Sequence, residues 1–146
     1  QLSLRMADGR LPDHPLRQRI WNQIGCDSHA AVKARVVRND FGTADFAALA
    51  PLVVEAATDG CSGAKEIVQR SATTLSSCIS TVAQRLSMHA PLVVCQGGAI
   101  THLPGFLTAV QQAIGESIPD ALWGEAKGDA CDGALRMAQD LTLRPR

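Results

Sequence analysis

The sequence has very few aromatic residues: they occupy 3% of its 146 positions, and tyrosine is absent. Platforms for stacked nucleic-acid bases and aromatic floors beneath sugars both need such side chains. The formal net charge is zero, because 14 Lys and Arg residues balance 14 Asp and Glu residues. A protein held to phosphates or to an anionic membrane needs a surplus of cations. We therefore expect neither a nucleic-acid nor a membrane partner.

Long apolar runs and paired metal ligands are missing as well. No stretch approaches the ~18 apolar residues that span a bilayer. The cysteines, odd in number and without a CxxC pair, are Cys26, Cys61, Cys78, Cys95 and Cys131. They predict small buried hydrophobic residues in a reducing cytoplasm, with no metal site. The histidines show no HExxH spacing, and only His102 lies near a candidate ligand loop.

What the chain does contain is an apolar content of 46%, which is typical of a globular protein. Its length suits one domain of roughly 100–200 residues. The chain opens at Gln1, however, and its first residues resemble the last turns of a helix that Gly9 closes. We therefore expect residues 1–146 to be one lobe of a longer protein.

Helical spacing of apolar residues covers most of the chain. The strongest stripe predicts one long amphipathic helix over residues 62–88, with Leu75 and Val82 on its apolar side and Ser76 among the side chains that face solvent. Proline and glycine punctuation marks the ends of the others. Further helices are expected from about residue 2 to 8, 16 to 24, 30 to 37, 43 to 50, 51 to 59, 103 to 114 and 130 to 141.

The periodicity changes after Pro91. Leu92-Val93-Val94-Cys95 is a short run rich in β-branched residues, which predicts a buried central strand. Gln96-Gly97-Gly98-Ala99 follows directly, before the next helix. Residues 118–123 are a candidate edge strand. The sequence thus predicts a helix, a buried strand, a glycine loop and a helix in succession.

The glycine pair is the first candidate site. Without Cβ atoms, Gly97 and Gly98 allow another group to approach the backbone closely. In open α/β sheets, ligands lie outside the carboxyl ends of strands, and free N–H groups there favour a polar or anionic ligand. A tight turn packed on a neighbouring element would explain the glycines equally well. The loop matches neither a Walker A motif nor a GxGxxG fingerprint.

The second candidate site is a run of small residues over 128–135, at the start of the last helix. Gly133 inside a helix costs about 1 kcal/mol relative to Ala, so some compensation is expected. Close approach to a ligand or to the glycine loop would supply it, and so would packing of the helix on a sheet.

In this order, the motifs resemble the C-terminal part of the BadF/BadG/BcrA/BcrD ATPase family, which includes N-acetylglucosamine and glucosamine kinases. The likeness extends from about Leu16 to Leu141. Its most similar segments are DFAALAPLVVEAATDG over residues 45–60, PLVVCQGGA over 91–99 and DGALRMA over 132–138. The resemblance implies a helix-rich α/β fold, namely an incomplete ribonuclease H-like C-terminal lobe of an actin-like ATPase or sugar kinase.

The resemblance also implies an ATP site. The residues that correspond to its adenosine contacts are Gln96, Gly97, Gly98, Ala99, Asp132 and Gly133. Gln96 stands where the family often has a small or aliphatic residue. The family's Asp-Gly-Gly-x-Thr and Gly-Asp-x-Gly-Ser-Gly segments are absent from this sequence. The catalytic base and most of the Mg²⁺ site are therefore expected in a missing N-terminal lobe, and no activity is expected from this chain alone.

The expected activity is phosphorylation of glucosamine or N-acetylglucosamine, and the expected partners are the N-terminal lobe, the amino sugar and a second copy of the chain. Two other hypotheses remain. One is the related ATPase that activates 2-hydroxyacyl-CoA dehydratases or benzoyl-CoA reductases, although the five cysteines lack the setting of an iron–sulfur ligand loop. The other is a non-catalytic helical module that binds a partner.

Overall fold

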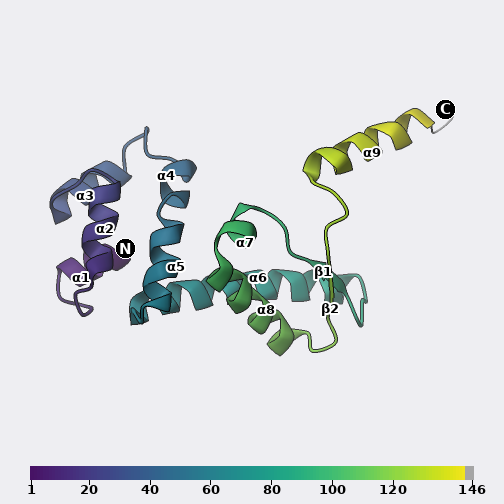
Figure 1. Ribbon diagram of the computed structural model, residues 1–146, viewed down its shortest axis with the longest axis horizontal. Helices are drawn as coiled ribbons and strands as arrows, with labels where there is room; N and C mark the ends of the chain where they lie inside the picture. The colour runs from purple at the N-terminus through teal and green to yellow at the C-terminus, as the bar shows by residue number, and fades with distance from the viewer. Residues whose placement is uncertain (144–146) are drawn as a thin grey trace.

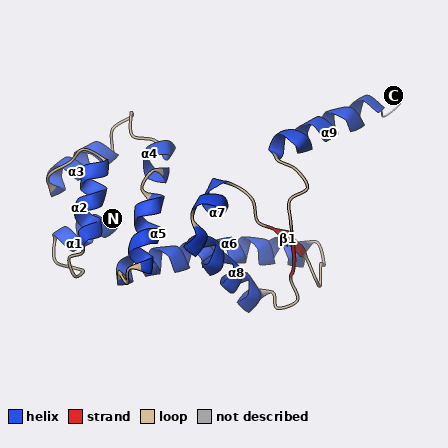
Figure 2. Ribbon diagram, viewed as in Figure 1, coloured by secondary structure: helices blue, strands red, loops and turns tan. Residues whose placement is uncertain are grey.

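The structure, a computed structural model that describes residues 1–143, consists mainly of helices, with one small sheet beside the end of α6 (Figures 1 and 2). It is thus a helix-rich α/β chain. The elements in order are α1 (Leu2–Ala7), α2 (Pro15–Gln23), α3 (His29–Val36), α4 (Thr43–Ala47), α5 (Ala50–Thr58), α6 (Ser62–Arg85), β1 (Leu92–Val94), α7 (Gly98–His102), α8 (Pro104–Ser117), β2 (Leu122–Gly124) and α9 (Ala130–Leu143). Within the described part, no helix combines the length and apolarity needed to cross a membrane.

Helices α1 to α5, with the first turns of α6, enclose the first of two hydrophobic cores. Its buried residues are Leu2, Met6, Leu16, Ile20, Trp21, Val32, Ala56, Cys61 and Ala64. Helix α1 crosses α6 so closely that a Cβ at Gly63 would lie 2.5 Å from Leu2 Cδ1. On the outside, Arg19 of α2 pairs with Glu55 of α5 at 2.5 Å. Exposed pairs of this kind contribute little, so apolar burial is what stabilises this part.

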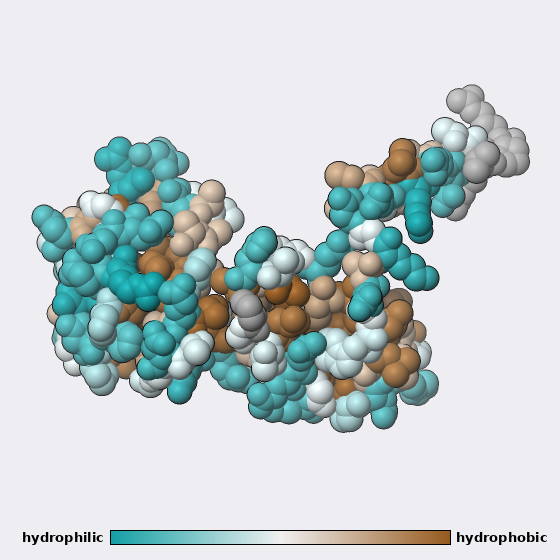
Figure 3. All heavy atoms as spheres, viewed as in Figure 1, coloured by the Kyte–Doolittle hydropathy of each residue, from teal (hydrophilic) through white to brown (hydrophobic). Residues whose placement is uncertain are grey.

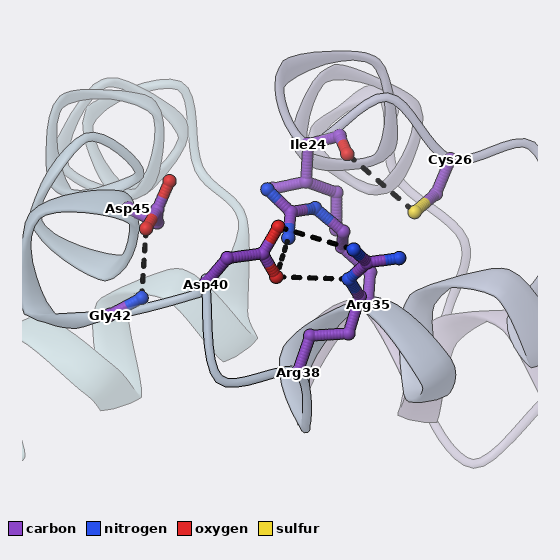
Figure 4. A network of polar contacts seen from close by, with 7 residues as sticks. All are labelled: Ile24, Cys26, Arg35, Arg38, Asp40, Gly42 and Asp45. Carbon is purple, nitrogen blue, oxygen red and sulfur yellow. Dashed lines mark hydrogen bonds and ion pairs between the residues drawn. The ribbon is translucent and has the colours of Figure 1, made fainter.

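A carboxylate holds the turn between α3 and α4 (Figure 4). Asp40 accepts hydrogen bonds from Arg38 Nε at 2.9 Å and from Arg35 Nη1 at 3.1 Å. The hydrogen bond from Arg38, together with the charges of both guanidinium groups, lowers the pKa of Asp40 below its ordinary value. Next along the chain, the Gly42 backbone N–H donates to Asp45 Oδ2 at 2.8 Å and so caps the start of α4.

Helix α6 joins the two parts of the molecule. Its first turns belong to the first core, whereas Ala72 lies in the second (Figure 1). The second core consists of Ala72, Val93, Val110, Ala113 and Ile114, from α6, β1 and α8. The long helix predicted here is confirmed, although it ends at Arg85, and Ser87 follows in a left-handed conformation with a φ of 52°.

The predicted side assignment of α6 is wrong at Ser76. This serine is 2% exposed at the contact with α8. Its Oγ donates to the carbonyl oxygen of Ala113 at 2.8 Å and is hydrogen-bonded to Ser117 Oγ. A buried hydroxyl is tolerated when it is paired in this way. Leu75 and Val82, which were expected in the buried stripe, are instead 41% and 55% exposed.

The sheet has two parallel strands, with Leu92 opposite Leu122 and Val94 opposite Gly124. Helices α7 and α8 make the connection between them, as parallel pairing requires. The strand predicted at 92–95 is confirmed, but its complete burial is wrong. Val93 is 8% exposed and packs into the second core, whereas Leu92 on the other face is 61% exposed.

The cysteines only partly follow the prediction of burial. Cys61 is buried, and Cys26 and Cys95 are intermediate. Cys78 of α6 and Cys131 of α9 are exposed. Both cysteines have apolar neighbours in the sequence, which predicted burial, but their own side chains lie on helix surfaces that no other described residue covers.

Helix α9 extends away from the rest of the molecule (Figure 1). Residues 130–142 are all exposed, including Leu135, Met137 and Leu141 at 60% or more. Apolar residues also gather on the surface where α6 ends beside the strands (Figure 3). The described structure therefore presents two exposed apolar surfaces, one on α9 and one on the sheet and α6.

Candidate functional site

The two segments singled out in the sequence meet at one edge of the sheet. Because β1 and β2 run parallel and Val94 is opposite Gly124, the loops that follow both strands leave from the same edge. The first loop carries Gln96 and the glycine pair, and the second leads to α9. Carboxyl ends of adjacent parallel strands are where ligands bind in open α/β sheets.

Glycine is required at position 97 because of its backbone conformation and not because a neighbouring group packs closely against it. Its φ of +116° is a conformation that residues with a side chain rarely adopt. A Cβ at Gly97 would have nothing within 4 Å, and one at Gly98 would meet only His102 Cδ2, at 3.9 Å. Among the described residues, no neighbouring element packs against the two glycines. The alternative explanation, a tight turn packed on such an element, is therefore not supported. The space in front of the loop is open to an approaching group.

A side-chain hydrogen bond connects the two segments. Gln96 Nε2 donates to the carbonyl oxygen of Gly128 at 3.1 Å. This contact gives Gln96 a structural role. Gln96 is the residue that stands where the similar family often has a small or aliphatic side chain. Gly128 belongs to the run of small residues that the sequence marks at the start of the last helix. Its position immediately before a helix-capping aspartate was the available indication.

Asp132 is already engaged in a local structure at the start of α9. The backbone N–H of Asp129 donates to Asp132 Oδ2 at 2.9 Å, and Asp129 Oδ1 accepts from the N–H of Asp132 at 2.9 Å. Such reciprocal bonds form a capping box. A Cβ at Gly128 would lie 2.6 Å from Asp132 Oδ2 and 2.9 Å from its Cβ, so glycine makes room for this cap.

Gly133 lies in the first turn of α9, and a methyl group on its Cα would have nothing within 4 Å. Neither the close approach to the glycine loop nor the helix–sheet packing considered from the sequence is present among the described residues. Gly133 and the exposed Asp132 thus face open space, and no described contact joins either residue to the glycine loop.

An apolar groove of about 360 Å³ begins beside the glycine loop. Ala99 forms part of its rim, and helices α4 to α8 supply the rest. The groove is lined by Phe46, Leu49, Ala50, Val53, Val54, Ile67, Val68, Ser71, Ala99, Leu103 and Phe106. Its lining is almost entirely apolar. The candidate site therefore offers exposed backbone at the loop and an apolar surface next to it.

The titratable side chains near the loop do not form a catalytic group. Cys95 is half-buried, and this burial raises the pKa of its thiol, which keeps it protonated at neutral pH. His102 is exposed at the end of α7. In the part of the chain that the structure describes, no three His, Cys, Asp or Glu side chains are grouped so as to hold a metal ion.

Comparison with known proteins gave no match to any family model, curated protein or solved structure.

Proposed function

We propose that this chain is the C-terminal, nucleotide-binding lobe of an ATP-dependent amino-sugar kinase with a ribonuclease H-like fold. The observation that carries the proposal is the contact of Gln96, which begins the glycine loop, with Gly128 of the segment before α9, at the carboxyl edge of two parallel strands. Binding sites occur at such edges. The sequence resemblance supplies the chemical identity of the ligand.

In this proposal, adenosine lies against the Gly97–Gly98 backbone. The open space in front of both glycines supports close approach, because neither has a Cβ and a Cβ added there would meet only His102 Cδ2, at 3.9 Å from the one on Gly98. The apolar groove at Ala99 offers a surface of the kind that suits a heterocyclic base. Asp132 and Gly133 are assigned to the same site because the Gln96–Gly128 hydrogen bond brings the segment before α9 to this loop.

The remaining parts of the reaction are assigned elsewhere. Phosphoryl transfer depends on positioning, a metal ion and a residue that orients the acceptor hydroxyl. The described residues offer no grouped metal ligands, so the proposal places Mg²⁺ and the catalytic base in an N-terminal lobe. It also includes the amino-sugar substrate, glucosamine or N-acetylglucosamine, a homodimer and a cytoplasmic location.

Titration with ATP, followed by the amide resonances of the chain, tests the nucleotide site. We expect shifts confined to residues 96–99 and 128–133. Gly98→Val is the informative variant, because the valine would fill the open space while its Cβ meets only the edge of His102. Gly115→Ala, at an exposed position of α8 with free space around it, is the matched control.

Loss of the ATP-dependent shifts in Gly98→Val, with the control unchanged, would support the proposal. Shifts spread over unrelated surfaces, or none at millimolar ATP, would contradict the role of this loop. A non-catalytic binding module is the second candidate, because exposed apolar surfaces on α9 and on the sheet favour a protein partner. That candidate predicts no response to ATP at the loop.

A further inference from the structure

Helix α9 has a continuous apolar side with no partner among the described residues. At 100° per residue the apolar residues from Ala130 to Leu141 fall within one half of the helix, and the charged and amide residues on the other. The apolar side consists of Ala130, Cys131, Ala134, Leu135, Met137, Ala138 and Leu141. All of them are exposed. An isolated 14-residue helix is marginal in water, so α9 needs a surface to pack on.

A groove of about 350 Å³ between the end of α6 and β1 is the matching surface. It is lined by Cys78, Ile79, Val82, Ala83, Met88, Pro91, Leu92, Val93 and Val94. Leu122 of β2, opposite Leu92 and 57% exposed, extends it across the sheet. Parallel sheets are ordinarily covered on both faces. This α6–β1 groove borders the face of the sheet on which Leu92 and Leu122 are exposed.

The chain's own α9 is directed away from this groove. Strand β2 ends at Gly124, and the hydrogen bond from Gln96 ties Gly128 to the loop after β1. The capping box at Asp129 then starts the helix from that tethered point, and the helix leads outward (Figure 1). Folding back would need a different backbone direction after Gly128, whereas a second molecule can bring its α9 to the groove with the observed conformation unchanged.

We propose that α9 of a second copy of this chain packs into the α6–β1 groove, and that the exchange is mutual. Each copy carries both the apolar side of α9 and the α6–β1 groove. A two-fold symmetric dimer therefore covers both surfaces of both copies and leaves none free to bind a third molecule. The end of α6 and the C-terminal part of α9 also carry opposite charges. Arg85 in the last turn of α6 and Asp140 of α9 each lack an ion pair within the described structure. The inference depends on these surfaces and not on nucleotide binding.

Two native cysteines report directly on this contact. Cys78 lies in the groove and Cys131 on the apolar side of α9, and both are exposed free thiols. A short bismaleimide added to the wild-type chain should therefore join Cys78 of one copy to Cys131 of another. The expected product is a covalent dimer, lost in Cys78→Ser and in Cys131→Ser. A link between the two cysteines of one chain would overturn the proposal in favour of α9 closing on its own groove.

Sedimentation velocity at roughly 100 µM tests the association without chemistry. Leu141→Asp on α9 and Val82→Asp in the groove each place a charge in the proposed contact, and we expect dimerisation to weaken about tenfold or more. Gln139→Asp, on the polar side of α9, is the matched control and should dimerise like the wild type. Because Val82 and Leu141 are 55% and 69% exposed, neither change disturbs a core, and circular dichroism verifies the fold. A monomeric wild type, or dimers unaffected by both substitutions, would refute the exchange.

Discussion

The side-chain amide of Gln96 donates a hydrogen bond to the backbone carbonyl of Gly128 at 3.1 Å. The two residues follow different strands, and this bond ties the segment before α9 to the glycine loop. The bond joins the candidate site to the segment from which α9 leaves the sheet.

Gln96→Ala should therefore release the segment that precedes α9. The bond is exposed and uncharged, so its loss costs about 0.5–1 kcal/mol locally and changes the global melting temperature little. Faster hydrogen exchange at the amides of Asp129, Cys131 and Asp132 is the expected result. Gln112→Ala, which removes an exposed bond to Glu116 within α8, is the control and should leave those amides unchanged. Unaltered exchange in Gln96→Ala would show that the tether is not formed in solution.

Two glycines near the start of α9 should respond in opposite directions to alanine. Gly128→Ala collides with Asp132 and disrupts the capping box, which should cost about 0.5–2 kcal/mol of helix stability. Gly133→Ala has free space and should stabilise the helix by about 1 kcal/mol through higher helix propensity. Helix content over residues 130–143, measured from Cα chemical shifts, checks both. A change of the same sign in both variants would contradict the cap.

Ser76→Ala should destabilise the contact between α6 and α8. The hydroxyl is buried and donates to the Ala113 carbonyl, and Ser117 Oγ also bonds to that carbonyl at 3.0 Å. Because Ser117 partly satisfies the acceptor after the change, we expect a loss of about 1 kcal/mol in urea denaturation. Ser77→Ala removes an exposed bond to the carbonyl of Thr73 in the same helix and serves as the control. It should be neutral or slightly stabilising.

Acid should weaken the turn between α3 and α4. The folded-state pKa of Asp40 is lowered by Arg38 and Arg35, so the stabilisation is present above its ordinary pKa of about 3.9 and is lost as pH falls through the folded value. Asp40→Asn should lower the melting temperature at pH 7 and flatten its dependence on pH in the acid range. Asp120→Asn, at an exposed carboxylate without an ion pair in the described structure, should change neither. A measured Asp40 pKa at or above the ordinary value would refute this.

The amphipathic helices could be predicted because their evidence is local. Apolar spacing and glycine or proline punctuation located α6 and the helices around it, and the β-branched run located β1. The short helix α7 was not expected, since Gly98 at its start was interpreted as part of a loop. The side of α6 that Ser76 faces also could not be predicted, because a partner on α8, 37 residues away, decides it.

For the candidate site, too, some features could be predicted from the sequence and others could not. The sequence by itself determined which residues have special backbone or capping properties, since Gly97 and the aspartates at the start of α9 act through bonds and angles within a few residues. Only the tertiary structure decided that the two segments meet, because parallel pairing of β1 with β2 brings the ends of both strands to one edge. It also decided that Leu92 and the apolar side of α9 stay exposed, because burial depends on which surfaces the rest of the fold covers.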